Sequence, residues 1–229
     1  MRSNKELWRG VEERKRLNAA FSHDLRTPLT VLKGHASMLL CGLTEDGMSR
    51  EEAAEEVRAM TGSIARLERY VEAMASLQRL EDVEVHREAV SFGELARGLR
   101  DSAQILCAGK ALKFQAIPGR SVRVDGEIVA QVFENILVNG ARYARSALEV
   151  RLWTEANRLM LRVRDDGPGF SPADLEKATE PFYRDKSTPD GGCPLGLGLN
   201  ICKILCRRHG GDIRLENDGG ASVTATFEG

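Results

Sequence analysis

Residues 21–30, F-S-H-D-L-R-T-P-L-T, lie within an apolar stripe that predicts the fold of the N-terminal part of the chain. The stripe consists of Leu17, Phe21, Leu25, Leu29 and Leu32. Separations of three or four residues place these side chains on one face of a helix. A second stripe consists of Val57, Met60, Ile64, Leu67, Val71 and Met74. Its alternating spacing is the heptad-type seam of helices that pack in bundles.

The two stripes together predict an α-helical hairpin. Residues 41–50 between them carry turn-forming residues, and Ser49 followed by Glu52 is a capping-box pattern for the second helix. An isolated hairpin would leave its apolar seam in water, and a second copy of the chain would cover it. We therefore expect a homodimer in which two hairpins form a four-helix bundle.

The remainder of the chain predicts an α+β domain. From about residue 85, β-branched runs alternate with helical patterns and glycine-rich turns. The expected helices are 91–107, one that Asp125 caps, and 195–209, and the expected strands are 112–117, 121–124, 147–154, 158–164, 211–216 and 221–227. We place the helical hairpin in residues 1–82 and the second domain in residues 83–229.

Composition excludes several classes of protein. The net charge of −1 gives no support to a nucleic-acid partner. The longest run without Lys, Arg, Asp or Glu is 191–202, shorter than the roughly 18 apolar residues of a membrane-spanning helix. The five cysteines lack paired C-x-x-C spacing, so we expect reduced core cysteines, without disulfides or zinc.

His23 is the first candidate for chemistry. It lies two residues from both Phe21 and Leu25, so its imidazole points away from the apolar stripe. An exposed imidazole, with a reference pKa of about 6.5, is mostly neutral and nucleophilic at pH 7. Asp24 would accept the Nδ1 proton and leave Nε2 available for attack on phosphorus. Pro28 predicts a bend just beyond this point. The plain alternative is an incidental histidine on a solvated helix face.

Residues 134–143, E-N-I-L-V-N-G-A-R-Y, place Asn135, Asn139 and Arg142 on one helical face. Amide oxygens are Mg²⁺ ligands, and a guanidinium holds phosphate oxygens. Asparagine is a poor helix former, which favours a functional reason for two of them over an ordinary polar face.

Two glycine-containing motifs follow. In residues 165–170, D-D-G-P-G-F, Gly167 and Gly169 would let a flat ligand approach the backbone, and Asp165 would accept a hydrogen bond from an exocyclic amine. Residues 194–199, P-L-G-L-G-L, precede a helix whose free N–H groups suit phosphates. Each motif taken alone also predicts an ordinary turn.

In this order, the motifs resemble those of the sensor histidine kinases of two-component systems. Residues 21–29 resemble that family's H box, 135–143 its N box, 165–170 its first glycine box, 180–185 its F box and 196–199 its second glycine box. The resemblance extends from about Leu17 to Phe227. It implies a dimerisation and phosphotransfer hairpin followed by an α/β sandwich ATP-binding domain of the histidine kinase/Hsp90-like type.

The resemblance also implies roles for individual residues. His23 would be the phosphoacceptor, Asp24 its activating neighbour, and Thr27 the residue that orients water for dephosphorylating the partner. Asp165 would recognise adenine, and Asn139 would contact Mg²⁺ directly. Residues 166–194 would form a mobile lid over ATP. The full set of implied ATP-binding residues is Asn135, Asn139, Arg142, Tyr143, Asp165, Gly167, Gly169, Tyr183, Arg184, Gly196, Leu197 and Gly198.

The chain departs from the family pattern at three positions. Pro194 stands where the second glycine box usually begins with glycine, which predicts a stiffer lid with altered phosphate contacts. Arg142 replaces a frequent lysine, and Arg145 replaces a small hydroxyl residue.

The resulting prediction is ATP-dependent autophosphorylation of His23, with ATP and Mg²⁺, and transfer to an aspartate of a response-regulator receiver domain. A phosphatase-dominant or scaffold-type dimer and an ATPase that shares the nucleotide fold are the alternatives. Because the sequence contains no sensor, we expect the cytoplasmic portion of a protein anchored in the bacterial inner membrane through segments absent from this chain.

Overall fold

The computed structural model describes residues 4–44, 47–81, 83–117, 119, 121–183 and 196–229. It divides into two compact units, Met1–Ser76 and Leu77–Gly229, which are described separately below. This division lies inside a helix, and the domain boundary after residue 82 stays a prediction.

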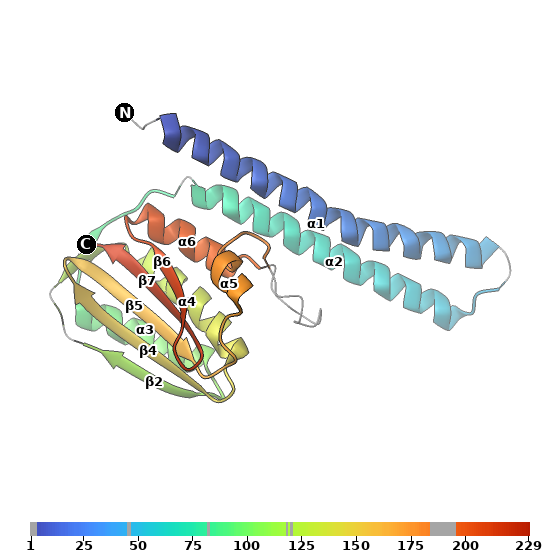
Figure 1. Ribbon diagram of the computed structural model, residues 1–229. Helices are drawn as coiled ribbons and strands as arrows, with labels where there is room; N and C mark the ends of the chain where they lie inside the picture. Colours follow the sequence, from blue (N-terminus) through green and yellow to red (C-terminus); the bar gives the residue numbers. More distant parts are fainter. Residues whose placement is uncertain (1–3, 45–46, 82, 118, 120, 184–195) are drawn as a thin grey trace. The chain divides into compact units, whose positions relative to one another are not determined.

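The first unit is the expected α-helical hairpin (Figure 1). Helix α1 spans Asn4–Thr44 and helix α2 spans Arg50–Glu81. The capping box predicted for α2 is confirmed, because the Ser49 N–H donates to Glu52 Oε2 at 2.8 Å and the Glu52 N–H donates to Ser49 Oγ at 3.2 Å. Helix α1 continues through Pro28, so the proline does not end it.

The two helices of the hairpin leave part of their apolar surface uncovered. A hydrogen bond of 2.5 Å joins His35 Nδ1 of α1 to Glu56 Oε2 of α2, while Tyr70 is buried. Val57, Ile64 and Val71, one heptad apart, remain 49%, 45% and 58% exposed within a single chain. Apolar side chains repeated in this way on one helix need a further surface to bury them.

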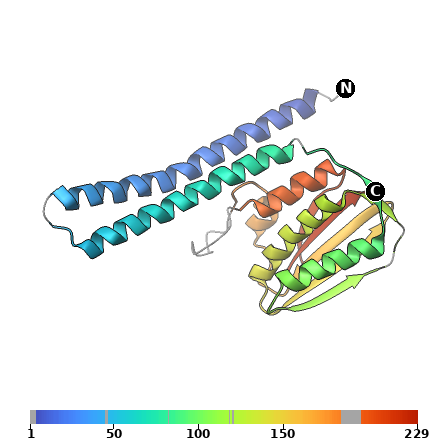
Figure 2. The same ribbon diagram turned by 180° about the vertical axis from the view of Figure 1, so that it is seen from behind.

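The second unit has a five-stranded sheet in the order β2-β4-β5-β7-β6. Its strands are β2 (Ala111–Ala116), β4 (Ala147–Glu155), β5 (Arg158–Asp165), β6 (Ile213–Asn217) and β7 (Ala221–Glu228). The β2–β4 pair is parallel and the other pairs are antiparallel. Helices α3 (Phe92–Leu106), α4 (Gly126–Tyr143) and α6 (Gly198–Arg208) cover one face of the sheet (Figures 1 and 2).

The core lies between that sheet face and the helices. Leu148, Val150 and Leu152 alternate along β4 with partly exposed residues, as expected of a strand with one buried face. Helix α4 contributes Val129, Val132, Phe133, Ile136 and Leu137 to the same core. Its N-terminus is capped as predicted, since Asp125 Oδ1 accepts from the N–H groups of Glu127 and Ile128. The predicted α/β sandwich is confirmed.

Several short elements differ from the sequence prediction. Strand β1 (Glu88–Val90) pairs with β3 (Val122–Val124), and helix α5 (Pro172–Lys177) lies within the expected lid; neither β1 nor α5 was predicted. Such short segments carry little periodicity and depend on partners distant in sequence. Helix α6 begins at Gly198, three residues later than predicted. Ser91 precedes α3 without the expected side-chain cap.

His209 follows the last turn of α6 and has a structural role inside the second unit. Its side chain is fully buried, and its Nε2 accepts a hydrogen bond of 2.9 Å from the Asp125 N–H. Burial lowers the pKa of this imidazole. His209 therefore acts as a neutral acceptor that joins the end of α6 to the start of α4.

The cysteines that the structure describes are reduced. Cys107, Cys202 and Cys206 are buried, and Cys41 is exposed. Burial raises the pKa of the Cys206 thiol to about 12 and that of Cys202 well above its ordinary value, so both stay protonated. Cys193 lies outside the described residues.

Candidate functional site

The two asparagines predicted for nucleotide chemistry are one helical turn apart on α4. Both are partly exposed, and Asn135 Nδ2 donates to the Gln131 carbonyl at 2.9 Å. A methyl group at Gly198 would come within 3.6 Å of Asn135 Oδ1. The packing of α4 against α6 therefore brings Asn135 of the N box beside the second glycine box, although these two segments are distant in sequence.

Asp165 closes strand β5 at the same end of the unit. Its Oδ1 accepts hydrogen bonds from the Gly167 N–H at 2.8 Å and the Ala221 N–H at 3.2 Å. Burial raises the pKa of this carboxyl, and those two backbone donors oppose the shift. Among the described residues Oδ2 has no hydrogen-bond partner, so one oxygen is held by the backbone while the other can accept from a ligand.

Gly167 and Gly169 are required by the protein's own packing as well as by any ligand. A Cβ at Gly167 would lie 2.4 Å from the Tyr143 carbonyl oxygen, which rules out a larger residue. Gly169 has φ +81° and a Cβ there would lie 2.8 Å from Asn217 Oδ1. The first glycine motif is thus pressed against the end of α4, which brings Tyr143 beside the turn.

Asn217 was missed by the sequence analysis, and it holds this glycine turn in place. Its Oδ1 accepts from the Phe170 N–H at 2.7 Å, and its Nδ2 donates to the Phe170 carbonyl at 2.8 Å. The amide pairs with the turn as a neighbouring strand would. In the sequence Asn217 only indicated the β6–β7 turn, since nothing local connects it with residue 170.

Asp166, the residue after Asp165, has a structural role that the sequence did not predict. Its carboxylate accepts from the Ser146 hydroxyl at 2.6 Å and from the Ser146 N–H at 3.0 and 3.1 Å. These bonds hold the pKa of Asp166 far below its ordinary value. They tie the turn that follows Asp165 to the start of β4.

The second glycine box presents an uncapped helix N-terminus. Gly196 has φ +72°, and Leu197 precedes α6 without a side-chain cap for the first N–H groups. Such groups, together with the helix dipole, favour an anion. Nearby, Asn200 donates from Nδ2 to the Thr179 carbonyl at 2.9 Å, and its Oδ1 is buried without a partner among the described residues.

The remaining implied ATP-binding residues are only partly described. Arg142 and Tyr143 are exposed at the end of α4, and the Tyr183 hydroxyl donates to Asp174 Oδ1 at 3.0 Å. Asp174 also completes a capping box with Ser171 at the start of α5. Arg184 and Pro194 lie outside the described residues, as does the rest of the expected lid between residues 184 and 195.

The predicted phosphoacceptor segment belongs to the first unit. His23, Asp24 and Thr27 all lie in the continuous helix α1, and Thr27 is exposed. The side chains of His23 and Asp24 are outside the part that the structure describes, so their predicted roles stay predictions.

Among the residues that the structure describes, no cluster of three or more His, Cys, Asp or Glu side chains suited to a metal ion occurs. No described helix combines the length and the apolar character needed to cross a bilayer.

A cavity of about 620 Å³ beside α3 is lined by residues such as Ser91 and Arg97, and it contains none of the predicted site residues.

The second unit therefore has the architecture of an ATPase domain, with paired asparagines, a buried aspartate and two glycine segments gathered at one end. Family models agree with both units. Residues 124–228 match the histidine kinase-, DNA gyrase B- and HSP90-like ATPase family, and residues 13–83 match the His Kinase A (phospho-acceptor) domain.

Curated relatives match nearly the whole chain. Sensor histidine kinase SpaK of Bacillus subtilis is 28% identical over 95% of this chain and 48% of its own length. Sensor protein KdpD of Escherichia coli is 32% identical over 93% of this chain and 24% of its own length. The chain thus spans half or less of the length of these relatives.

Solved structures show the same fold. Histidine kinase AdeS of Acinetobacter baumannii has a TM-score of 0.60 at 22% identity, covering 90% of this chain and 97% of AdeS. Full-length ShkA in complex with AMPPNP has a TM-score of 0.60 at 20% identity, covering 93% of this chain and 45% of ShkA. The chain belongs to the two-component sensor histidine kinases and carries their phospho-acceptor and ATP-binding domains.

Proposed function

We propose that the protein uses ATP to phosphorylate His23 and then transfers the phosphoryl group to an aspartate of a response regulator. The observation that carries this proposal is the presence in one chain of a phospho-acceptor domain over residues 13–83 and an ATPase domain over residues 124–228. The helical position of His23 in α1 supports it. An ATPase without a phosphoacceptor would have no use for that hairpin.

The second unit supplies the nucleotide site. Asp165 Oδ2 is oriented to accept from the adenine amino group, because backbone N–H groups already hold Oδ1. The uncapped N-terminus of α6 would bind phosphate oxygens. Asn135, Arg142, Tyr143, Tyr183 and Arg184 would complete the site as the family resemblance implies. The ShkA complex with AMPPNP supports a nucleotide ligand for this fold.

The residues on α4 also suit Mg²⁺. Proteins commonly hold this ion through one or two oxygen ligands together with substrate phosphates, which fits a single amide such as Asn139. Bound there, the ion would neutralise charge on the phosphates. Asn135 and Asn139 would then orient the nucleotide, since they lie on one face of α4 with Gly198 opposite.

The chemical step at His23 needs little covalent participation by other groups. Nε2 of the neutral imidazole attacks the γ-phosphorus, the bond from that phosphorus to the bridging oxygen breaks, and ADP leaves with the electron pair. Asp24 accepts a hydrogen bond from Nδ1–H and stabilises the positive charge that develops on the ring. Positioning and electrostatics supply most of the rate.

The same hairpin would serve the partners of the reaction. Pairing of two hairpins would bury the exposed residues at positions 57, 64 and 71, and the helix around His23 would receive the response regulator. Thr27, four residues beyond His23, would orient water for dephosphorylation of that partner. We place the chain on the cytoplasmic side of a larger, membrane-anchored bacterial sensor; its longer relatives are named as sensor proteins.

The test is incubation with γ-labelled ATP and Mg²⁺, followed by acid and alkali treatment. The wild type and His86→Gln should acquire acid-labile, alkali-stable label, whereas His23→Gln should acquire none. His86 is a suitable control because its side chain is exposed and lies in the second unit. Nucleotide binding, measured in parallel, shows that each variant is folded.

Two outcomes would contradict the proposal. Label that persists in His23→Gln would place the phosphoacceptor elsewhere. ATP hydrolysis without any label in the wild type would favour the ATPase interpretation.

A further inference from the structure

The sheet face that the helices leave uncovered carries several charged side chains. Residues that point to this face alternate with the core residues along β2, β4 and β5, and they include Lys113, Glu149, Arg151, Arg162 and Arg164. Neighbouring strands bring these charges directly opposite one another, because Glu149 pairs with Arg164 and Arg151 pairs with Arg162 in the β4–β5 register.

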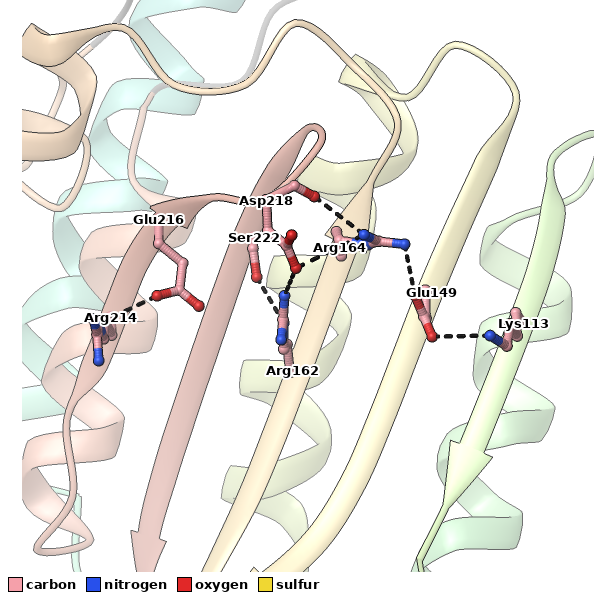
Figure 3. Close-up of polar contacts among 8 residues, drawn as sticks. All are labelled: Lys113, Glu149, Arg162, Arg164, Arg214, Glu216, Asp218 and Ser222. Carbon is pink, nitrogen blue, oxygen red and sulfur yellow. Dashed lines mark hydrogen bonds and ion pairs between the residues drawn. The ribbon is translucent and has the colours of Figure 1, made fainter.

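Most of these charges are matched in a ladder across the sheet (Figure 3). Lys113 Nζ lies 3.2 Å from Glu149 Oε1, and Arg164 Nη2 lies 2.8 Å from Glu149 Oε2. On the other side, Asp218 forms ion pairs with Arg164 and Arg162. Arg162 Nε also donates to Ser222 Oγ at 2.9 Å.

Arg151 is the exception in this ladder. It has no ion pair or hydrogen bond to the described residues, and its Nε is buried without a partner. Its direct cross-strand neighbour on one side is another cation, Arg162, and on the other side it is Gln115 of β2. Like charges opposite each other destabilise a sheet, and a buried donor without an acceptor is unfavourable.

A cavity lies at this point of the sheet face. It has a volume of about 180 Å³ and is lined by Glu149, Arg151, Arg162, Arg164 and Asp218. Three cations and two carboxylates line it, so one positive charge is unbalanced. Since a water molecule occupies roughly 30 Å³, the cavity has room for a small oxyanion.

We propose that this cavity, hereafter the Arg151 cavity, is a binding site for a small oxyanion of the phosphate or carboxylate class. An oxyanion placed there would accept from the guanidinium of Arg151, which lines the cavity, and reduce the repulsion between Arg151 and Arg162. Arginine forks bind such groups through paired hydrogen bonds. None of the residues assigned to the nucleotide lines the cavity, so the proposal stands apart from the proposed kinase function.

The experiment observes the arginine side chains of the full chain directly by nitrogen-15 NMR, with ADP saturating the nucleotide site. The probes are inorganic phosphate and acetate, each compared with chloride at equal ionic strength. We expect a saturable shift of the Arg151 Nε–H resonance with phosphate, acetate or both. Arg151→Lys should remove that resonance and reduce the accompanying shifts of the Gln115 and Arg162 amides at least tenfold.

Arg158→Lys is the matched control, because Arg158 lies at the start of β5 and does not line the cavity. It should leave the phosphate and acetate titrations unchanged. An equal shift of the Arg151 Nε–H resonance with chloride would show that the effect is ionic screening, and it would overturn the proposal. Absence of any shift with either probe, or shifts of Gln115 and Arg162 that persist in Arg151→Lys and in Arg151→Gln, would also overturn it.

Discussion

At the residue scale, Asn217 decides whether the first glycine turn keeps its shape. Two hydrogen bonds join its side chain to the backbone of Phe170. Each is worth about 1 kcal/mol. We expect Asn217→Ala to weaken binding of an ATP analogue about tenfold, as measured by calorimetry, because the turn beside Asp165 would lose its anchor.

A suitable control for that measurement is Asn157→Gly. Asn157 also donates to a backbone carbonyl, that of Gly229, and its φ of +61° suits glycine. This variant should lose some stability and retain its affinity for the analogue. Unchanged affinity in Asn217→Ala would show that the turn does not depend on this side chain.

His209 predicts a dependence of stability on pH. The pKa of its buried imidazole is lower in the folded chain than in the unfolded chain, so the unfolded state binds more protons in that interval. The contribution of neutral His209 to stability is therefore complete above the pKa of the imidazole in the unfolded chain, about 6.5. It is lost as the pH falls from there through the lower pKa of the folded chain. Urea midpoints measured from pH 8 to pH 5 should decrease accordingly.

The variant that checks this assignment is His209→Gln, whose urea midpoint should be lower at pH 8 and vary less between pH 8 and pH 5. His86→Gln, which changes an exposed imidazole, should keep the wild-type dependence. If His209→Gln retained the full dependence, another group would be responsible.

At the scale of the element, the start of α2 depends on its capping box. Removing the Ser49 hydroxyl leaves the Glu52 N–H without its acceptor. We expect Ser49→Ala to lower the free energy of unfolding by about 1 kcal/mol. Urea denaturation followed by circular dichroism measures this loss.

Ser63 provides the comparison within the same helix. Its hydroxyl donates to the Ala59 carbonyl, a bond that competes with the helix instead of capping it. Ser63→Ala should therefore be neutral or slightly stabilising. Equal losses in Ser49→Ala and Ser63→Ala would mean that the hydroxyl at the cap has no special role.

The elements also show which sequence patterns are informative. Asp125 and Ser49 were recognised as caps because a long apolar helix follows each of them. The same kind of capping box at Ser171 and Asp174 was overlooked, since α5 is only six residues long and lies in a segment with many prolines and glycines. Length, more than the capping residue itself, made the helix predictable.

At the scale of the whole molecule, the hairpin should pair with a second copy. Val57, Ile64 and Val71 are exposed in the single chain and repeat every seven residues along α2. We expect Ile64→Glu to dissociate the dimer by placing a charge in its apolar seam. Sedimentation should show the wild type as a dimer and this variant as a monomer at the same micromolar concentration.

Arg58→Glu introduces the same residue at an exposed position beside Val57 and outside the seam. It should remain dimeric. A monomeric wild type across the accessible concentrations would contradict the expected four-helix bundle.

The sequence by itself determined the helical hairpin, the family and the candidate residues of both units. These depend on patterns of short range: heptad spacing, a capping residue, and motifs such as D-D-G-P-G-F. The tertiary structure decided the rest. It paired Asn217 with Phe170 and buried His209 against Asp125. Such relations join residues far apart in the chain, and only the closing of the sheet and the packing of α4 and α6 bring them within hydrogen-bonding distance.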